Sequence, residues 1–188
     1  KIINSNAINA KVIKKTLNKN IFKKYSRNIE LIEDLSYSKQ RKITKLNYYQ
    51  LEGFNSREYT VPIIWYGDKK LKNEFEALLF KYNLKITFGG KLNNISGLHS
   101  KVDSMDLFIN HYKNKFRIKK CITISLGDSQ NDIEILNNSN YSGIVKNDNY
   151  KIINLKKKNN IFRSFTKAPH GWVEVLKKII IKMEKDYY

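Results

Sequence analysis

The sequence has little cysteine, little acid and no long apolar run. A single cysteine, Cys121, excludes a disulfide framework and favours a cytoplasmic location over secretion. The longest run of isoleucine, at 179–181, is far shorter than the ~20 apolar residues that span a bilayer, so we expect no membrane partner. Hydrophobic residues still make up 41% of the 188 residues, which is enough for buried cores.

The shortage of acid leaves 17 acidic residues against 36 basic ones and a formal net charge of +19. Such a charge attracts anions and would suit a nucleic-acid surface. However, the basic residues are spread along the whole chain, and the short run at 156–158 lies in a predicted polar segment. Lysine, asparagine, isoleucine and tyrosine are all abundant, as expected when an AT-rich genome biases codon use. We therefore expect no specific nucleic-acid partner, although loose, salt-sensitive attachment stays open.

The segment 121–136 carries the clearest chemical pattern. Its apolar start predicts a buried strand at 121–126, and its end predicts a helix at 131–138. Asp128 and Asp132 lie between them, where parallel α/β sheets bind ligands. Their carboxylates suit Mg²⁺, and Ser129 and Asn131 can orient them or bind an anion. A polar turn before a capped helix would also give this pattern.

Lys101 lies just before a predicted helix at 102–115, whose apolar residues are expected to form a buried face. If this helix runs away from the site and the strand at 121–126 runs back, Lys101 and Asp128 lie at the same end of the layer. A cation near a magnesium carboxylate is what phosphoryl transfer requires, and a helix N-terminus adds amide donors. A solvated surface lysine is the competing interpretation.

Together these residues resemble the haloacid dehalogenase-like phosphatases. Within that superfamily, five segments occur in the order found in the mannosyl-3-phosphoglycerate phosphatases: 57–65 (REYTVPIIW), 89–91 (GGK), 97–101 (GLHSK), 127–132 (GDSQND) and 168–172 (APHGW). The resemblance implies a magnesium-dependent phosphatase that converts mannosyl-3-phosphoglycerate to mannosylglycerate and phosphate. Glucosyl-3-phosphoglycerate and sucrose phosphate are alternative substrates.

The resemblance also implies roles for individual residues. Asp128 would bind Mg²⁺, Asp132 would support that metal site, and Lys101 would contact the phosphoryl group. Ser129 and Asn131 would organise the loop.

In the mobile cap, the resemblance makes Lys91 and Arg57 candidates for binding the anionic glycerate of a phosphorylated sugar-glycerate substrate. Two departures from the family pattern affect the predicted substrate and site. Val102 replaces a usual glycine, and Asn93 with Asn94 replaces a common aromatic–histidine pair.

The superfamily's Asp-x-Asp motif, which supplies the nucleophile and the general acid, does not occur in the sequence. It belongs to a first strand that lies beside the strand predicted at 121–126. We therefore expect the 188 residues alone to be inactive and to need the missing N-terminal core segment as a partner. A non-catalytic remnant that binds an anion or nucleic acid is the alternative.

The predicted fold class is α/β, with a partial Rossmann-like haloacid dehalogenase core and an α+β cap domain. We predict a cap at 1–96, with helices on one face of its sheet, and the C-terminal half of the core at 97–188, joined at a hinge near Gly97. Pro62 predicts an edge strand or a bulge. Expected elements of the cap are helices near 8–19, 28–35, 38–46 and 69–82, and strands near 21–28, 58–66, 84–88 and 91–96. Expected elements of the core are helices at 102–115, 131–138 and 171–185, and strands at 121–126, 141–146 and 161–165.

Overall fold

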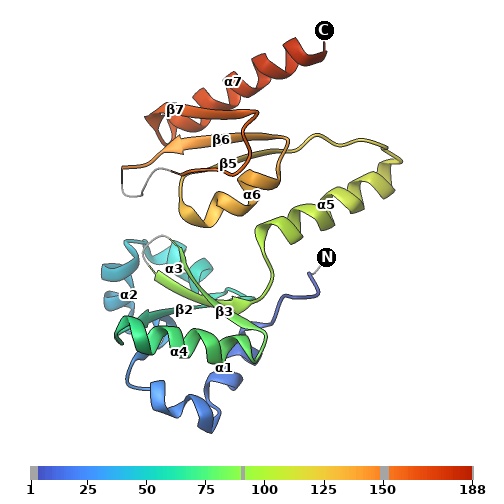
Figure 1. Cartoon of the computed structure of the whole chain (residues 1–188). Helices are drawn as coiled ribbons and strands as arrows, with labels where there is room; N and C mark the ends of the chain where they lie inside the picture. Colours follow the sequence, from blue (N-terminus) through green and yellow to red (C-terminus); the bar gives the residue numbers. More distant parts are fainter. Residues whose placement is uncertain (1–3, 90–91, 149–152, 188) are drawn as a thin grey trace. The chain divides into compact units, whose positions relative to one another are not determined.

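The computed structural model describes residues 4–89, 92–148 and 153–187 (Figure 1). The chain divides into two compact units, Lys1–His99 and Ser100–Tyr188. Each unit has its own sheet, and together they form a mixed α/β protein, as predicted. No helix among the described residues has the length and apolar character needed to cross a bilayer.

The first unit is built on an antiparallel four-stranded sheet in the order β1-β2-β4-β3. Its strands are β1 (Ile29–Leu31), β2 (Thr60–Trp65), β3 (Leu84–Gly89) and β4 (Leu92–Gly97). Its α-helices are α1 (Ala10–Leu17), α2 (Tyr37–Thr44), α3 (Tyr48–Asn55) and α4 (Lys69–Phe80), with short 3₁₀ helices at Asn20–Tyr25 and Ile32–Asp34.

Helices cover both faces of this sheet, which corrects the expectation that they lie on one. Val61 and Ile63 of β2 pack with Phe75 of α4 in the larger cluster. On the opposite face Ile64 packs with Leu51 of α3 in a smaller cluster. The alternation of β2 side chains between the two faces therefore supports two hydrophobic layers.

Several local predictions in this unit were wrong. The segment predicted as a strand near 21–28 is the 3₁₀ helix Asn20–Tyr25, which buries Phe22 and Tyr25, three residues apart. The helix predicted near 28–35 is β1 followed by a 3₁₀ turn. Helix α3 was not predicted, although Asn47 and Gln50 form a reciprocal capping box at its start.

Pro62 lies in an interior strand, yet its position still fits its chemistry. Strand β1 pairs only with Ile63, Ile64 and Trp65 of β2. Pro62 lies just outside that paired stretch, while its other neighbour is β4. The strand is therefore locally an edge at Pro62, where a missing amide hydrogen is tolerated.

The second unit contains a parallel three-stranded sheet in the order β5-β6-β7. Its strands are β5 (Ile124–Gly127), β6 (Tyr141–Lys146) and β7 (Ile161–Lys167). Its α-helices are α5 (Lys101–Phe116), α6 (Ile133–Asn138) and α7 (His170–Tyr187). A 3₁₀ turn, Gln130–Asp132, leads into α6.

The two faces of this sheet pack against different helices (Figure 1). Leu136 of α6 packs with Ile144 on one face. Val175 and Ile179 of α7 pack with Tyr141 on the other. A Cβ at Gly143 would lie 2.1 Å from Val175 Cγ1, so this glycine permits the close approach of α7.

Strand β5 begins three residues later than predicted. The backbone N–H and the hydroxyl of Thr123 donate to Asn140 Oδ1, both at 2.9 Å, so a side chain takes the amide that would extend the ladder. The Thr123 carbonyl still accepts from the Tyr141 N–H at 3.0 Å. Cys121 precedes the strand and is half-buried, which corrects its placement within a buried strand. Trp172 is likewise half-buried, so it is a weaker core anchor than expected.

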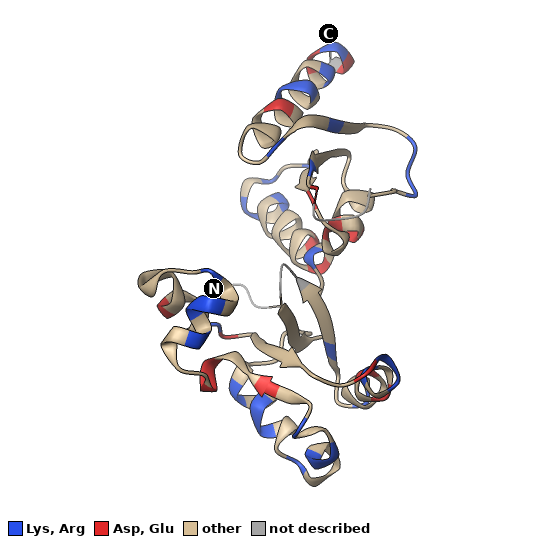
Figure 2. Ribbon diagram, turned by 90° about the vertical axis from the view of Figure 1, so that its left-hand side faces the viewer, with Lys and Arg blue, Asp and Glu red and all other residues tan. Residues whose placement is uncertain are grey.

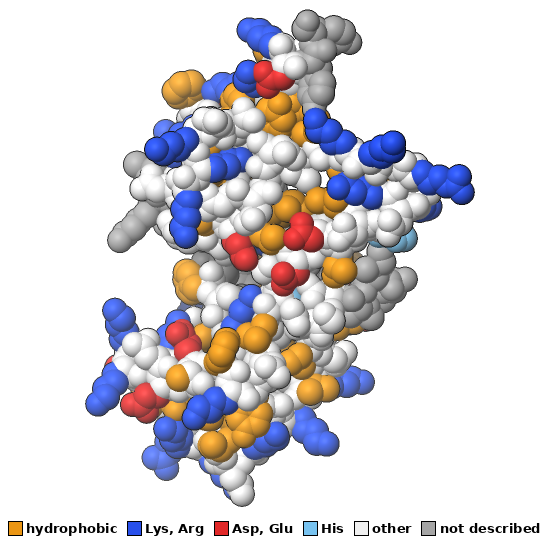
Figure 3. Space-filling view, turned by 45° about the vertical axis from the view of Figure 1, so that its right-hand side comes forward, with side chains coloured by type: hydrophobic (Ala, Val, Ile, Leu, Met, Phe, Trp, Pro, Cys, Tyr) orange, Lys and Arg blue, Asp and Glu red, His pale blue; other side chains and the backbone are white. Residues whose placement is uncertain are grey.

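Helix α5 has no buried residue, which corrects the expected buried face. Instead Phe108, Tyr112 and Phe116 form an exposed aromatic row along it, with centroid separations of 5.4 and 4.6 Å. Figure 3 shows exposed hydrophobic side chains between the basic ones on the molecular surface.

Candidate functional site

Lys101 is held at the first position of α5 by a reciprocal cap. The Ser100 N–H donates to Asp103 Oδ2 at 2.8 Å, and the Asp103 N–H donates to Ser100 Oγ at 3.1 Å. This capping box fixes where the helix begins. From that position the Lys101 ammonium forms an ion pair with Asp132 Oδ1. The Lys101 side chain remains 52% exposed, whereas that of Asp132 is 10% exposed.

Asp132 organises the loop that follows β5. Its Oδ2 accepts hydrogen bonds from the backbone N–H groups of Asp128 at 3.2 Å and Ser129 at 3.3 Å. The Ser129 hydroxyl lies 3.2 Å from the same oxygen and also bonds Asn131 Oδ1. A buried carboxylate requires such compensation, and Asp132 receives it from four donors, counting Lys101. Asp132 therefore joins the start of α5 to the end of β5.

Gly127 allows this carboxylate to approach the backbone. A Cβ at this position would lie 2.4 Å from Asp132 Cβ and 2.9 Å from Asp132 Cγ. A glycine is required for steric reasons. The sequence suggested a sharp exit from the strand here, but it could not show which side chain fills the space.

Asp128 has a separate partner that the sequence reasoning missed. Its Oδ2 accepts a hydrogen bond from Asn147 Nδ2 at 2.9 Å. Asn147 directly follows β6, and β5 and β6 are parallel, so their carboxyl ends lie at the same edge. A polar residue directly after the next predicted strand was the available signal.

The carboxylates of Asp128 and Asp132 can be compared with the ligands that Mg²⁺ requires. Among the described residues, no group of three or more His, Cys, Asp or Glu side chains could hold a metal ion. Both oxygens of Asp132 already accept from protein donors, whereas the carboxylate of Asp128 accepts one hydrogen bond from the described residues, at Oδ2. Mg²⁺ commonly uses one or two carboxylates with waters and substrate phosphate. Asp128 fits such a partial site, with Asp132 as its support.

Two of the predicted substrate-binding residues, Lys91 and Arg57, belong to the first unit. Lys91 lies outside the described residues, so its predicted role stays a prediction. Arg57 precedes β2, donates from Nη1 to Asn94 Oδ1 at 3.3 Å, and lies 4.3 Å from the centroid of Phe54. Partial burial lowers the pKa of the Arg57 guanidinium below its usual value.

The structure thus brings together Lys101, Asp128, Ser129, Asn131 and Asp132 at the carboxyl end of β5. Arg57 belongs to the other unit. Basic residues occur on elements of both units rather than on one helix (Figure 2).

Comparison with solved structures shows which fold the chain has. The fold is similar to that of a phosphatase of the haloalkanoate (HAD) enzyme superfamily from Bacteroides thetaiotaomicron, with a TM-score of 0.57 and 18% identity. The match covers 92% of this chain and 65% of that one. A haloacid dehalogenase-like hydrolase from Bacillus subtilis matches with a TM-score of 0.34, which is too low to carry an argument. The chain has a haloacid dehalogenase-like fold, as the motifs predicted.

A relative in sequence, whose activity is named, gives a more specific likeness. The chain is 25% identical, over 155 residues, to the glucosyl-3-phosphoglycerate/mannosyl-3-phosphoglycerate phosphatase of Persephonella marina. This match confirms the predicted resemblance to haloacid dehalogenase-like phosphatases. It covers 81% of this chain but 56% of the relative, so the chain spans about half of that protein's length. No protein-family model matches the sequence.

Proposed function

We propose that this chain supplies the cap and the phosphate-binding part of the core of a magnesium-dependent sugar-phosphate phosphatase. The observation that carries the proposal is the Asp132 network, which joins Lys101 at a helix N-terminus to the loop amides after β5. This arrangement places a cation and the carboxylate of Asp128 at one sheet edge. Phosphoryl transfer depends mainly on such positioned charges.

In this proposal Lys101 binds a phosphoryl oxygen and Asp132 positions Lys101. Asp128 would hold Mg²⁺, which when bound neutralises charge on the phosphoryl oxygens. Asn147 fixes the carboxylate of Asp128 through its amide, and Ser129 with Asn131 shapes the loop. Because half of the Lys101 side chain is exposed, its ammonium can exchange Asp132 for a substrate anion without a large rearrangement.

In this proposal the nucleophile is supplied from outside the 188 residues, since the sequence contains no Asp-x-Asp. Strand β5 has only β6 as a neighbour among the described residues, and its Ile124 is 39% exposed. Helix α5 of the same unit presents its exposed aromatic row. We propose that an aspartate-bearing strand pairs with the outer edge of β5 in parallel, where its carboxyl end would lie beside Asp128. The greater length of the relatives supports such a segment.

The substrate class follows from the curated relative, whose name specifies two glycosyl-3-phosphoglycerates. Such a substrate has a carboxylate as well as a phosphate. Arg57 and Lys91 are the proposed partners of that carboxylate, because an arginine fork matches carboxylate geometry. Mannosyl- and glucosyl-3-phosphoglycerate are both candidates, and the products would be the glycosylglycerate and phosphate.

The direct test is phosphate release with Mg²⁺ and each glycosyl-3-phosphoglycerate. We expect no multiple turnover from the 188-residue chain, because it lacks the nucleophile. Fusing the Asp-x-Asp segment of the Persephonella marina relative ahead of Lys1 should produce turnover. Lys101→Ala in the fusion should reduce kcat/KM at least about a hundredfold, whereas Lys115→Ala, an exposed lysine on the same helix, should not.

A second measurement does not depend on the fusion. Orthophosphate with Mg²⁺ should shift the amide NMR signals of Asp128 and Ser129 in the unfused chain, and Lys101→Ala should abolish these shifts. Turnover by the unfused chain would contradict the proposal. Phosphate binding that is unchanged in Lys101→Ala would contradict it as well.

A further inference from the structure

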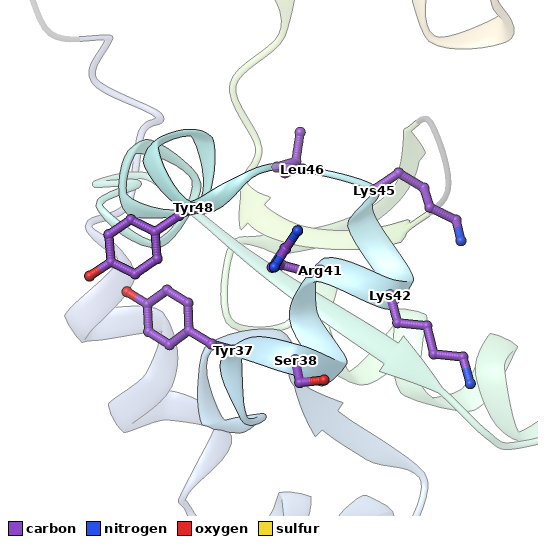
Figure 4. A pocket seen from close by; sticks show the side chains of 7 residues that line it. All are labelled: Tyr37, Ser38, Arg41, Lys42, Lys45, Leu46 and Tyr48. Atoms are coloured by element: carbon purple, nitrogen blue, oxygen red, sulfur yellow. The ribbon is translucent and has the colours of Figure 1, made fainter.

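A basic groove lies in the first unit between α2 and the start of α3. It has a volume of about 550 Å³ and is lined by Tyr37, Ser38, Arg41, Lys42, Lys45, Leu46 and Tyr48. Figure 4 shows Arg41 between the tyrosine pair on one side and the two lysines on the other. Pockets for small ligands have volumes in this range. None of these residues belongs to the candidate site of the second unit.

The charged residues that line the groove are all basic. Arg41, Lys42 and Lys45 are all exposed, and none takes part in an ion pair within residues 4–89, 92–148 and 153–187. Cations in the last turn of α2 interact favourably with the helix dipole. That effect explains their place in α2 but leaves their charge available to an anion.

Two of the residues that line the groove, Tyr37 and Tyr48, are exposed tyrosines. Tyr37 and Tyr48 stack with a centroid separation of 5.3 Å and an interplanar angle of 21°, and Tyr49 meets Tyr48 edge-on at 5.9 Å. Yet Tyr37 is 45% exposed, Tyr48 54% and Tyr49 81%. An exposed aromatic pair beside cations provides a stacking surface for a flat ring next to a binding site for phosphate.

The groove is built on a fixed base. Gln40 is 2% exposed, donates to the Leu35 carbonyl at 2.8 Å, and accepts from Asn55 Nδ2 at 2.9 Å. This contact ties α2 to α3. Beneath it, Leu46 packs against the cluster that contains Leu51. Because buried contacts hold both helices, the groove is formed before any ligand arrives, which lowers the entropic cost of binding.

We propose that this groove binds a nucleoside polyphosphate. The planar base would lie against the Tyr37–Tyr48 pair, and the phosphates would contact Arg41, Lys42 and Lys45. Three cations suit a ligand with two or more phosphates better than a ligand with a single phosphate. A flat aromatic base, rather than a saturated sugar ring, matches stacked tyrosines. The site is independent of the phosphoryl site proposed above.

Isothermal titration of the full chain with ADP, in chelated buffer without Mg²⁺, tests the proposal. We expect saturable binding at one site per chain, with adenosine and pyrophosphate each at least about tenfold weaker because each retains only half of the contacts. Tyr48→Leu and Arg41→Gln should each weaken ADP binding about tenfold.

Two controls separate this site from other cations. Lys69→Gln removes an exposed charge from α4, and Lys101→Ala removes the lysine of the second unit; neither should change the Kd for ADP. If Lys101→Ala abolished ADP binding, the groove would not be the ADP site, whereas the proposed phosphatase site would not be contradicted. In the unaltered chain, ADP should also shift the amide NMR signals of α2 and α3, a readout that needs no variant.

Other outcomes overturn the proposal as well. Absence of saturation would exclude the site, and pyrophosphate binding as tight as that of ADP would show that charge alone is responsible. Binding of a short oligothymidylate more tightly than ADP, with the same sensitivity to Tyr48→Leu, would assign the groove to single-stranded nucleic acid instead.

Discussion

At the scale of residues, the site depends on one carboxylate that receives several donors at once. Asp132 is buried, and its position is possible only because Gly127 has no side chain. The sequence identified Asp128, Asp132 and Lys101 by type and spacing. It did not identify Asn147, because the contact with Asp128 joins residues 19 positions apart through two parallel strands.

Gly127→Ala tests this close approach. We expect it to lower the free energy of unfolding by about 1–3 kcal/mol, because the new methyl group would overlap Asp132. Urea denaturation followed by circular dichroism measures the change. The matched control is Gly53→Ala in α3, where no atom lies within 4 Å of the new Cβ. That substitution should stabilise by about 0.5–1 kcal/mol, since alanine favours a helix. Equal effects at both positions would contradict the steric argument.

At the scale of elements, the sequence predicted well those segments whose own residues carry a clear pattern, and poorly those whose burial depends on distant partners. Strand β6 was predicted at 141–146 and is found at Tyr141–Lys146, because a run of apolar and small residues is buried on both faces of a parallel sheet. The 3₁₀ helix Asn20–Tyr25 was mistaken for a strand, since Phe22 and Tyr25 gain their burial from α4 and not from local propensity. Packing partners distant in sequence decided these short segments.

The junction of β7 and α7 gives a prediction of pH dependence. Lys178 and the backbone N–H groups of Phe165 and Thr166 lower the pKa of Glu174 from 4.5 to about 2. A lowered pKa means that the ionised form is favoured in the folded state, so its contribution is present above pH 4.5 and is lost as the pH falls toward 2.

Glu174→Gln should therefore be less stable than the unaltered chain at neutral pH, and the difference should shrink below pH 4.5. Urea unfolding at a series of pH values measures it. Glu184→Gln, an exposed change in the same helix, should show no such trend. A difference for Glu174→Gln that grows as the pH falls would reverse the assigned sign.

At the scale of the whole molecule, a high net charge coexists with a strand edge, the outer side of β5, that no strand of the described residues pairs with. The charge of +19 keeps copies apart at low salt, whereas the outer side of β5 offers backbone groups for pairing. Because the sequence lacks Asp-x-Asp, the strand that would lie beside β5 was predicted to be missing. What the sequence could not predict is that α5 would lack buried residues, because its apolar residues alone suggested a core-facing helix.

We expect the chain to self-associate as salt screens this repulsion. Ile124→Lys should suppress association by placing a charge on the edge strand. Light scattering across a salt series measures it. Leu176→Lys is the matched control, because Leu176 of α7 is as exposed as Ile124, at 39%. If both variants suppress association equally, general surface charge and not the β5 edge is responsible.

The contact between Arg57 and Asn94 has a consequence for the proposed binding of the substrate carboxylate by Arg57. Asn94 orients the guanidinium with a neutral carbonyl, and no ion pair among the described residues uses Arg57. A carboxylate in place of that amide would cancel the charge it orients. The guanidinium is instead held by a neutral partner, so in the proposed role an incoming carboxylate would meet a cation that need not first release a competitor.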